Sequence, residues 1–133
     1  MIRSLALALL LVACVAPPPA NNNPVARPLA GTSWVMVHEA DARAVPTIEF
    51  REAGRASGST GCNQWFAQVD RREAGLSFHS IGMTRRACEP AAMEVERAFA
   101  QSLGQAHAAQ VDEDMLTLIG ENGEAVARFE RAR

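Results

Sequence analysis

The stretch that decides the fold lies at residues 115–129, which read MLTLIGENGEAVARF. Its two apolar runs, Met115–Ile119 and Ala125–Phe129, are separated by a short polar segment that contains Asn122 and Gly123. An Asn-Gly pair between two such runs favours a β-hairpin, because both central residues of a type I′ turn need a positive φ. The sequence therefore predicts two antiparallel strands joined by a tight turn.

The β pattern of this hairpin is repeated in the preceding part of the chain. Four further short strands alternate polar and apolar residues, and Gly54, Gly58 and Gly61 indicate turns or close backbone approaches. The charged segment Asp70–Gly75 is predicted to be the turn between the last two of these strands. The four predicted strands are Thr32–His38, Thr47–Phe50, Trp65–Val69 and Leu76–Phe78. The pairs that share one face of the first two strands are Trp34 with Met36, and Ile48 with Phe50.

One segment departs from the β pattern and predicts a helix. Pro90 suits the first helical position, and Gly104 is a natural stop about 14 residues later. The fold class is therefore predicted to be α+β, with a small, mainly antiparallel β-sheet and one amphipathic helix packed on it. The apolar residues that recur at helical spacing, and that should lie on the sheet, are Ala92, Val95, Phe99 and Leu103.

The composition limits the chain to one folded domain and excludes one class of partner. Of the 133 residues 48% are apolar, but 25 of these are alanines, so the core is modest. The net charge is −2, and all 13 basic residues are arginines scattered along the chain. A nucleic-acid surface needs basic side chains concentrated on one face. We therefore expect no nucleic-acid partner.

The N-terminal residues are typical of a bacterial lipoprotein. Arg3 supplies a positive charge, Leu5–Val12 form a short apolar run, and Leu11-Val12-Ala13-Cys14 matches a lipobox. The apolar run is shorter than the ~20 residues that a membrane-spanning helix needs. We therefore predict a signal peptide at residues 1–13 and lipid attachment at Cys14. A secretory signal peptide cleaved at another position is the alternative.

The predicted lipid would anchor the rest of the chain to a membrane. Residues 14–28, with the lipidated cysteine, are rich in Pro and Asn and predict an extended tether, and residues 29–133 form the predicted domain. Because Val15 rather than Asp follows the cysteine, we expect the inner leaflet of the outer membrane, facing the periplasm. Two or three acyl chains on one cysteine give stable anchoring.

The two other cysteines, Cys62 and Cys88, form an even pair in a chain bound for an oxidising compartment. A disulfide between them would close a loop of about 27 residues and stabilise the domain by roughly 3.5 kcal/mol. The alternatives are a catalytic thiol and half of a metal site. A thiol nucleophile needs a base, and none of the three histidines has a spacing that singles it out. With no CxxC or HxxxH motif, we expect neither metal nor cofactor.

Several short motifs occur in one order along residues 29–129. They are Leu29-Ala30-Gly31-Thr32-Ser33-Trp34, Gly58, Gly61-Cys62-Asn63, Ile81-Gly82-Met83-Thr84 with Cys88, Met93-Glu94-x-Glu96-x-x-Phe99 with Leu103, and Leu116-x-Leu118 with Gly123 and Phe129. Together they resemble the META domain, the family of the heat-inducible HslJ-type envelope proteins. The resemblance implies a half-barrel-like antiparallel sheet with one helix across it. It implies no defined activity, but an association with envelope stress, tolerance of hydrophobic antibiotics, and motility or virulence.

The sequence departs from this family pattern after Cys62-Asn63, where the family tends towards a small residue and then Tyr. Ala67 and Val69 occupy that region here, so a role for a tyrosine hydroxyl is absent.

Polar and aromatic residues concentrate near the predicted disulfide. We interpret four of them as a possible partner-binding patch, since Trp and Arg are enriched in interaction hot spots. The structural alternative is that Asn63 satisfies turn backbone groups, that Thr84 bonds a neighbouring loop and that Trp65 is structural. The residues of the predicted patch are Gln64, Trp65, Arg85 and Arg86.

No catalytic motif is found. The chain has no GxSxG elbow, no phosphate-binding glycine loop and no lysine. The sequence thus favours a non-catalytic binding or scaffold module of the cell envelope that is linked to stress tolerance. We expect it to be a monomer and to bind an unidentified envelope protein. The alternatives are a protease-inhibitor-like module and a small envelope enzyme. His79 or His107 within hydrogen-bond reach of an Asp, Glu or Cys that lines a cleft would favour the enzyme.

Overall fold

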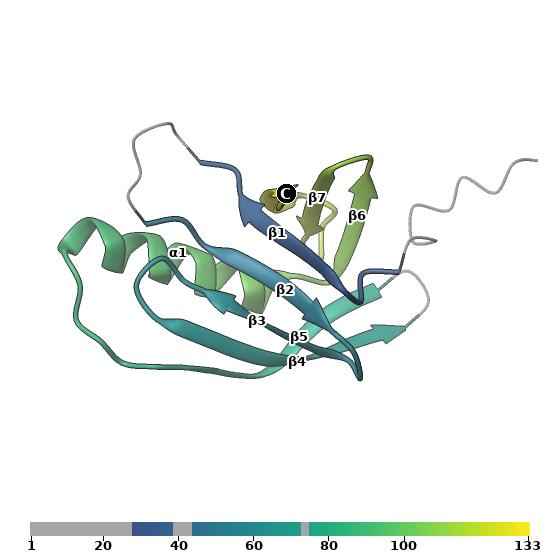
Figure 1. The fold of residues 1–133 in the computed structure, drawn as a ribbon. Coiled ribbons are helices and arrows are strands. Elements are labelled where there is room, and N and C mark those ends of the chain that lie inside the picture. Colours follow the sequence, from purple (N-terminus) through teal and green to yellow (C-terminus); the bar gives the residue numbers. More distant parts are fainter. Residues whose placement is uncertain (1–27, 39–43, 73–74) are drawn as a thin grey trace, which may run out of the picture.

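The computed structural model describes residues 28–38, 44–72 and 75–133. Within these residues the chain forms eight strands and one helix, and each strand pairs antiparallel with the next. The predictions for residues 1–27, including Cys14 and the signal peptide, lie outside the described residues. The elements are β1 Thr32–Met36, β2 Thr47–Arg51, β3 Arg55–Ser59, β4 Gln64–Arg72, β5 Gly75–Met83, α1 Pro90–Gln105, β6 Ala108–Asp112, β7 Met115–Ile119 and β8 Ala125–Arg131 (Figure 1).

The sheet closes into a barrel, so the prediction of a half-barrel-like sheet is wrong. β1 pairs with β8 from Trp34↔Arg131 to Met36↔Phe129, which joins the two ends of the domain. On the other side of the barrel, the described residues of β5 and β6 share the single pair Gly75↔Ala108. Closure leaves no open sheet edge at β1 or β8, and it depends on contacts between distant residues that no local pattern encodes. The single helix of the α+β prediction is present.

The β7–β8 hairpin forms as predicted, but its turn differs. The Gly120 N–H donates to the Glu124 carbonyl (2.8 Å), and the Gly123 N–H donates to the Gly120 carbonyl (3.1 Å). Gly123 has a φ of 83°, whereas Asn122 is not among the residues with positive φ. The connection is therefore a three-residue loop with a type I turn followed by a left-handed glycine, rather than a type I′ turn.

Two strands were not predicted from the sequence. β3 reads RASGS and β6 reads AAQVD, so neither has the branched and aromatic residues that are typical of strands. Gly58 in β3 is needed because β2 passes very close to it. A Cβ on Gly58 would lie 2.2 Å from the Thr47 carbonyl oxygen. The sequence prediction of a close backbone approach at Gly58 is thus confirmed.

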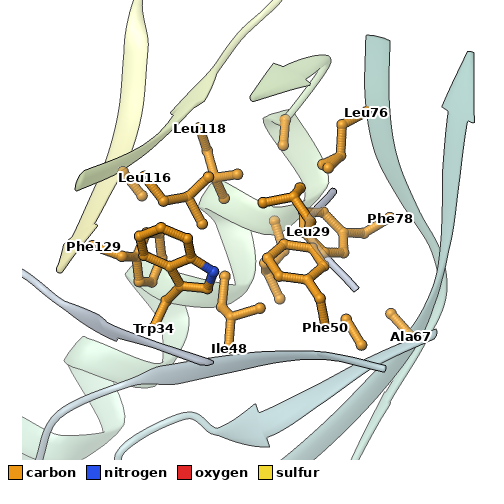
Figure 2. Packing of buried hydrophobic residues seen from close by; sticks show 14 of the residues in the cluster. Leu29, Trp34, Ile48, Phe50, Ala67, Leu76, Phe78, Leu116, Leu118 and Phe129 are labelled. Carbon is orange, nitrogen blue, oxygen red and sulfur yellow. The ribbon is translucent and has the colours of Figure 1, made fainter. Parts of the chain in front are cut away.

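The inward faces of the strands form one hydrophobic core. Ile48 and Phe50 are buried as their alternation predicts, Trp34 is buried with them, and Met36 packs at the edge of the core. Figure 2 shows Trp34, Ile48 and Phe50 converging inside the barrel with side chains of β5, β7 and β8. The core residues labelled there are Leu29, Trp34, Ile48, Phe50, Ala67, Leu76, Phe78, Leu116, Leu118 and Phe129.

The helix adds its own apolar residues to this core. Phe99 and Leu103 of α1 are fully buried, as their helical spacing predicts. The ring of Phe99 meets Trp65 edge-on at 5.5 Å between centroids and meets Phe129 at 6.3 Å. Among the described residues, no helix combines the length and apolar character needed to cross a membrane.

Candidate functional site

The loop before β4 and the segment leading into α1 are joined covalently. Cys62 and Cys88 form a disulfide, the pairing that the sequence predicts. Cys62 is buried, whereas Cys88 is partly exposed. The disulfide therefore holds the segment between β5 and α1 against the turn that precedes β4.

Asn63 connects this turn to the same segment through hydrogen bonds. Its side-chain oxygen Oδ1 accepts from the Thr84 hydroxyl (3.0 Å) and from the Arg86 backbone N–H (2.7 Å). Its Nδ2 donates to the Arg86 carbonyl (3.2 Å) and to the Glu96 carboxylate (2.9 Å). Asn63 is 3% exposed, so its donors and acceptors need such partners. These bonds support structural roles for Asn63 and Thr84.

Thr60 and Glu96 complete this network; from the sequence, Glu96 was named only as part of the helix motif, and Thr60 was not named. The Thr60 hydroxyl accepts from the Asn63 N–H (2.7 Å) and donates to Glu96 Oε2 (2.5 Å). Glu96 projects from α1, 36 residues along the chain from Thr60. No local motif connects residues this far apart, so only the packing of α1 on the barrel reveals their contact.

Of the four residues predicted to form a binding patch, three are exposed. Gln64 and Arg85 present their side chains to solvent. Arg86 is exposed as a whole, but its Nη2 donates to the Cys62 carbonyl (2.9 Å) and so also braces the turn. Together with Cys62, Asn63 and Thr84 they line a shallow hollow of about 300 Å³.

Trp65 does not belong to this patch, so the prediction that it is a partner-binding residue is wrong. It is 1% exposed, and its indole N–H donates to the Thr47 carbonyl (3.0 Å) inside the barrel. The reason is the alternation of β4, which turns Trp65 inward and its neighbour Phe66 outward. The structural alternative for Trp65 is therefore the one that holds.

Asp70 and His79 line one hollow, but among the described residues neither His79 nor His107 has a hydrogen bond to an acidic residue or a cysteine. His79 Nε2 lies 2.9 Å from the Ser77 hydroxyl, and His107 Nδ1 lies 2.9 Å from the Gln105 carbonyl. Both histidines are exposed. In the described ranges, no group of three or more His, Cys, Asp or Glu residues could hold a metal ion.

The sequence model of the META domain family matches residues 27–133, which include the barrel, the helix and the disulfide-braced turn. The chain belongs to the META domain family. This confirms the resemblance drawn from the short motifs. No curated protein matches the chain.

Solved structures share the fold of this META domain. An NMR structure of a protein from Burkholderia xenovorans is 24% identical, with a TM-score of 0.69, over 95% of this chain and 99% of that one. A crystal structure of a DUF4847 family protein from Bacteroides vulgatus is 15% identical, with a TM-score of 0.57, over 77% of this chain and 93% of that one. At these identities the likeness concerns the fold alone.

Proposed function

We propose that this META domain is a non-catalytic binding module of the cell envelope, held by lipid on Cys14 at the inner leaflet of the outer membrane. The lipobox-like residues before Cys14 and the pair of cysteines in the domain support export and anchoring. In this role the domain contributes to tolerance of envelope stress, for which the family membership is the support.

The observation that carries the binding role is the way Arg85 is presented. The residues on both sides of it, Thr84 and Arg86, donate hydrogen bonds to the same buried Oδ1 of Asn63. The Arg85 side chain itself is exposed, and it extends from a backbone that is held in place. A contact on a preorganised loop loses less conformational entropy on binding, which favours affinity.

The anchoring is tested on the mature protein from envelopes. Mass spectrometry should find the chain starting at an acylated Cys14, and Cys14→Ser should abolish incorporation of labelled palmitate. Val15→Asp is the matched variant, which should keep the lipid but move the protein to the inner-membrane fraction. An unmodified Cys14, or an intact Met1, would overturn the anchoring.

The binding role is tested by crosslinking in intact envelopes. Arg85→Glu should remove crosslinked partners, because it reverses the charge of the presented side chain. Arg97→Glu is the control, since Arg97 is an exposed arginine on α1 that does not line the hollow beside Arg85. Identical crosslinked species for the wild type and Arg85→Glu would contradict this site.

The braced loop also favours a second candidate, a protease-inhibitor-like module. An exposed arginine held from both sides suits the primary pocket of a trypsin-like protease, which binds a basic side chain through a carboxylate. The measurement is the inhibition constant for trypsin with the wild type and Arg85→Ala. Rapid cleavage after Arg85 would show an ordinary substrate and rule this candidate out.

A further inference from the structure

Four donor side chains lie in one row across the outer surface of the barrel. The strand register places Arg51 opposite Arg55, Arg55 opposite Gln68, and Gln68 opposite His79. All four residues are exposed, and they come from β2, β3, β4 and β5 in turn. Neighbouring strands lie about 4.8 Å apart, so this row, the donor row, is about 14 Å long.

An aromatic ring lies next to the donor row. Phe66 is 60% exposed and follows Gln64 and precedes Gln68 on the outward side of β4. Its ring covers Gly82 of β5, because a Cβ on Gly82 would come within 2.4 Å of Phe66 Cζ. The ring is therefore positioned by the neighbouring strand without being buried, and it offers apolar surface beside polar donors.

A β-bulge widens the polar surface at the end of the row. Between Gln68↔His79 and Phe66↔Gly82, β5 has one residue more than β4. The bulge places Ser80 at a φ of 52°, which is strained for a serine, and leaves both His79 and Ser80 exposed. Two shallow hollows, of about 460 and 620 Å³, flank the row and share Arg55 and Gln68 in their walls.

The charges at this surface leave one guanidinium available at its centre. Arg51 pairs with Glu49 at 3.0 Å, and Arg72 pairs with Asp70 at 3.0 Å. Among residues 28–38, 44–72 and 75–133, no ion pair involves Arg55. Glu49 offsets the charge of Arg51, which faces Arg55 across the strands, and Asp70, which lines a hollow with Arg55, is engaged by Arg72. The site therefore complements a carboxylate, which an arginine can bind through two hydrogen bonds.

The position of the row on the barrel narrows the class of ligand. β2, β3 and β4 have a strand partner on both edges, so an extended peptide cannot add to them as a further strand. Over these three strands a ligand contacts side chains: it offers a hydroxyl to Gln68, a carboxylate to Arg55 and a flat apolar face to Phe66, and a further hydroxyl reaches Ser80 of β5. An open row suits a polymer that crosses the strands.

We propose that the donor row and Phe66 bind an acidic glycan, a polysaccharide that carries carboxylates. This inference rests on the proposed binding function, and it specifies the chemical class of ligand that the binding module would take. The surface is continuous with the disulfide loop through β4, whose Gln64 lines the hollow beside Arg85.

The test is a calorimetric titration that measures the dissociation constant of a polygalacturonate oligosaccharide. It uses the full-length protein, purified from envelopes in detergent. Arg55→Gln should weaken binding about tenfold, because it removes the charge-assisted hydrogen bonds to the carboxylate. Phe66→Ala should weaken it as well. Arg128→Gln, an exposed arginine of β8, is the matched control and should bind like the wild type.

Three outcomes would overturn the glycan assignment. These are equal binding of the methyl-esterified, neutral oligosaccharide, equal binding of polyphosphate, and no binding by the wild type. If glycan binding fails while the Arg85-dependent crosslinks persist, the proposed binding function stands and only this inference falls. If both are lost, the binding function falls too.

Discussion

At the scale of single residues, Asn63 shows how one buried side chain organises a surface loop. Asn63→Ala would leave the Arg86 N–H and the Thr84 hydroxyl without their acceptor and would remove a donor from Glu96. We expect the free energy of unfolding to fall by about 2–4 kcal/mol, since unsatisfied partners add to the lost bonds. Urea denaturation measures this. Gln64→Ala, at the exposed neighbouring position, should change it by less than about 0.5 kcal/mol.

Trp65 and Phe66 are adjacent in sequence but have opposite environments. Trp65→Ala should lower the free energy of unfolding by about 3–5 kcal/mol, because it leaves a cavity against Phe99 and removes the bond to Thr47. Phe66→Ala should lower it by less than about 1.5 kcal/mol, since its ring is mostly exposed. Thermal denaturation of both variants tests the pair. Equal losses would contradict the inward and outward assignment of β4.

At the scale of elements, two glycines respond to the same substitution in opposite ways. Gly104 lies in the last turn of α1, and a Cβ there would meet no atom within 4 Å. Gly104→Ala should therefore stabilise the protein by about 0.5–1 kcal/mol. Gly58→Ala should destabilise it, because the new Cβ would overlap the backbone of β2. Denaturation midpoints of the two variants decide this, and a stabilising Gly58→Ala would contradict the close approach of β2 and β3.

At the scale of the whole molecule, the disulfide is a large part of the stability of a small domain. Replacing both Cys62 and Cys88 by Ser should cost roughly 3.5 kcal/mol, the loop-closure entropy for their separation of 26 residues. Peptide mapping without reduction should recover the linked peptides from periplasmic material. Two free thiols there would show that the bond does not form in the cell.

The barrel is weakest where β5 meets β6. Among the described residues, Gly75↔Ala108 is the one register pair there, and the Leu76 N–H donates to the His107 carbonyl (2.8 Å). By contrast, β7 and β8 pair at five positions. In hydrogen exchange followed by NMR, the Leu76 amide should exchange through local opening, well before the amides of the β7–β8 ladder. Exchange of both at the same rate would show that the barrel opens as one unit.

Local patterns were enough to predict most elements and part of the site. The hairpin of β7 and β8, the helix with its buried Phe99, and the Cys62–Cys88 pair all follow from alternation, helical period or composition. Alternation alone could not say which side of β4 faces the core. Trp65 was therefore assigned to a surface patch from the sequence, whereas the structure buries it.

The sequence by itself determined the local conformations and the META family, because periodicity, turn residues and short motifs are properties of neighbouring residues. Only the tertiary structure decided that the sheet closes, since β1 and β8 come from opposite ends of the domain. It alone also brought Glu96 of the helix to Asn63, and Arg55 into one row with Gln68 and His79. These contacts depend on strand register and helix packing, which arise from the whole core and are not encoded in any one segment.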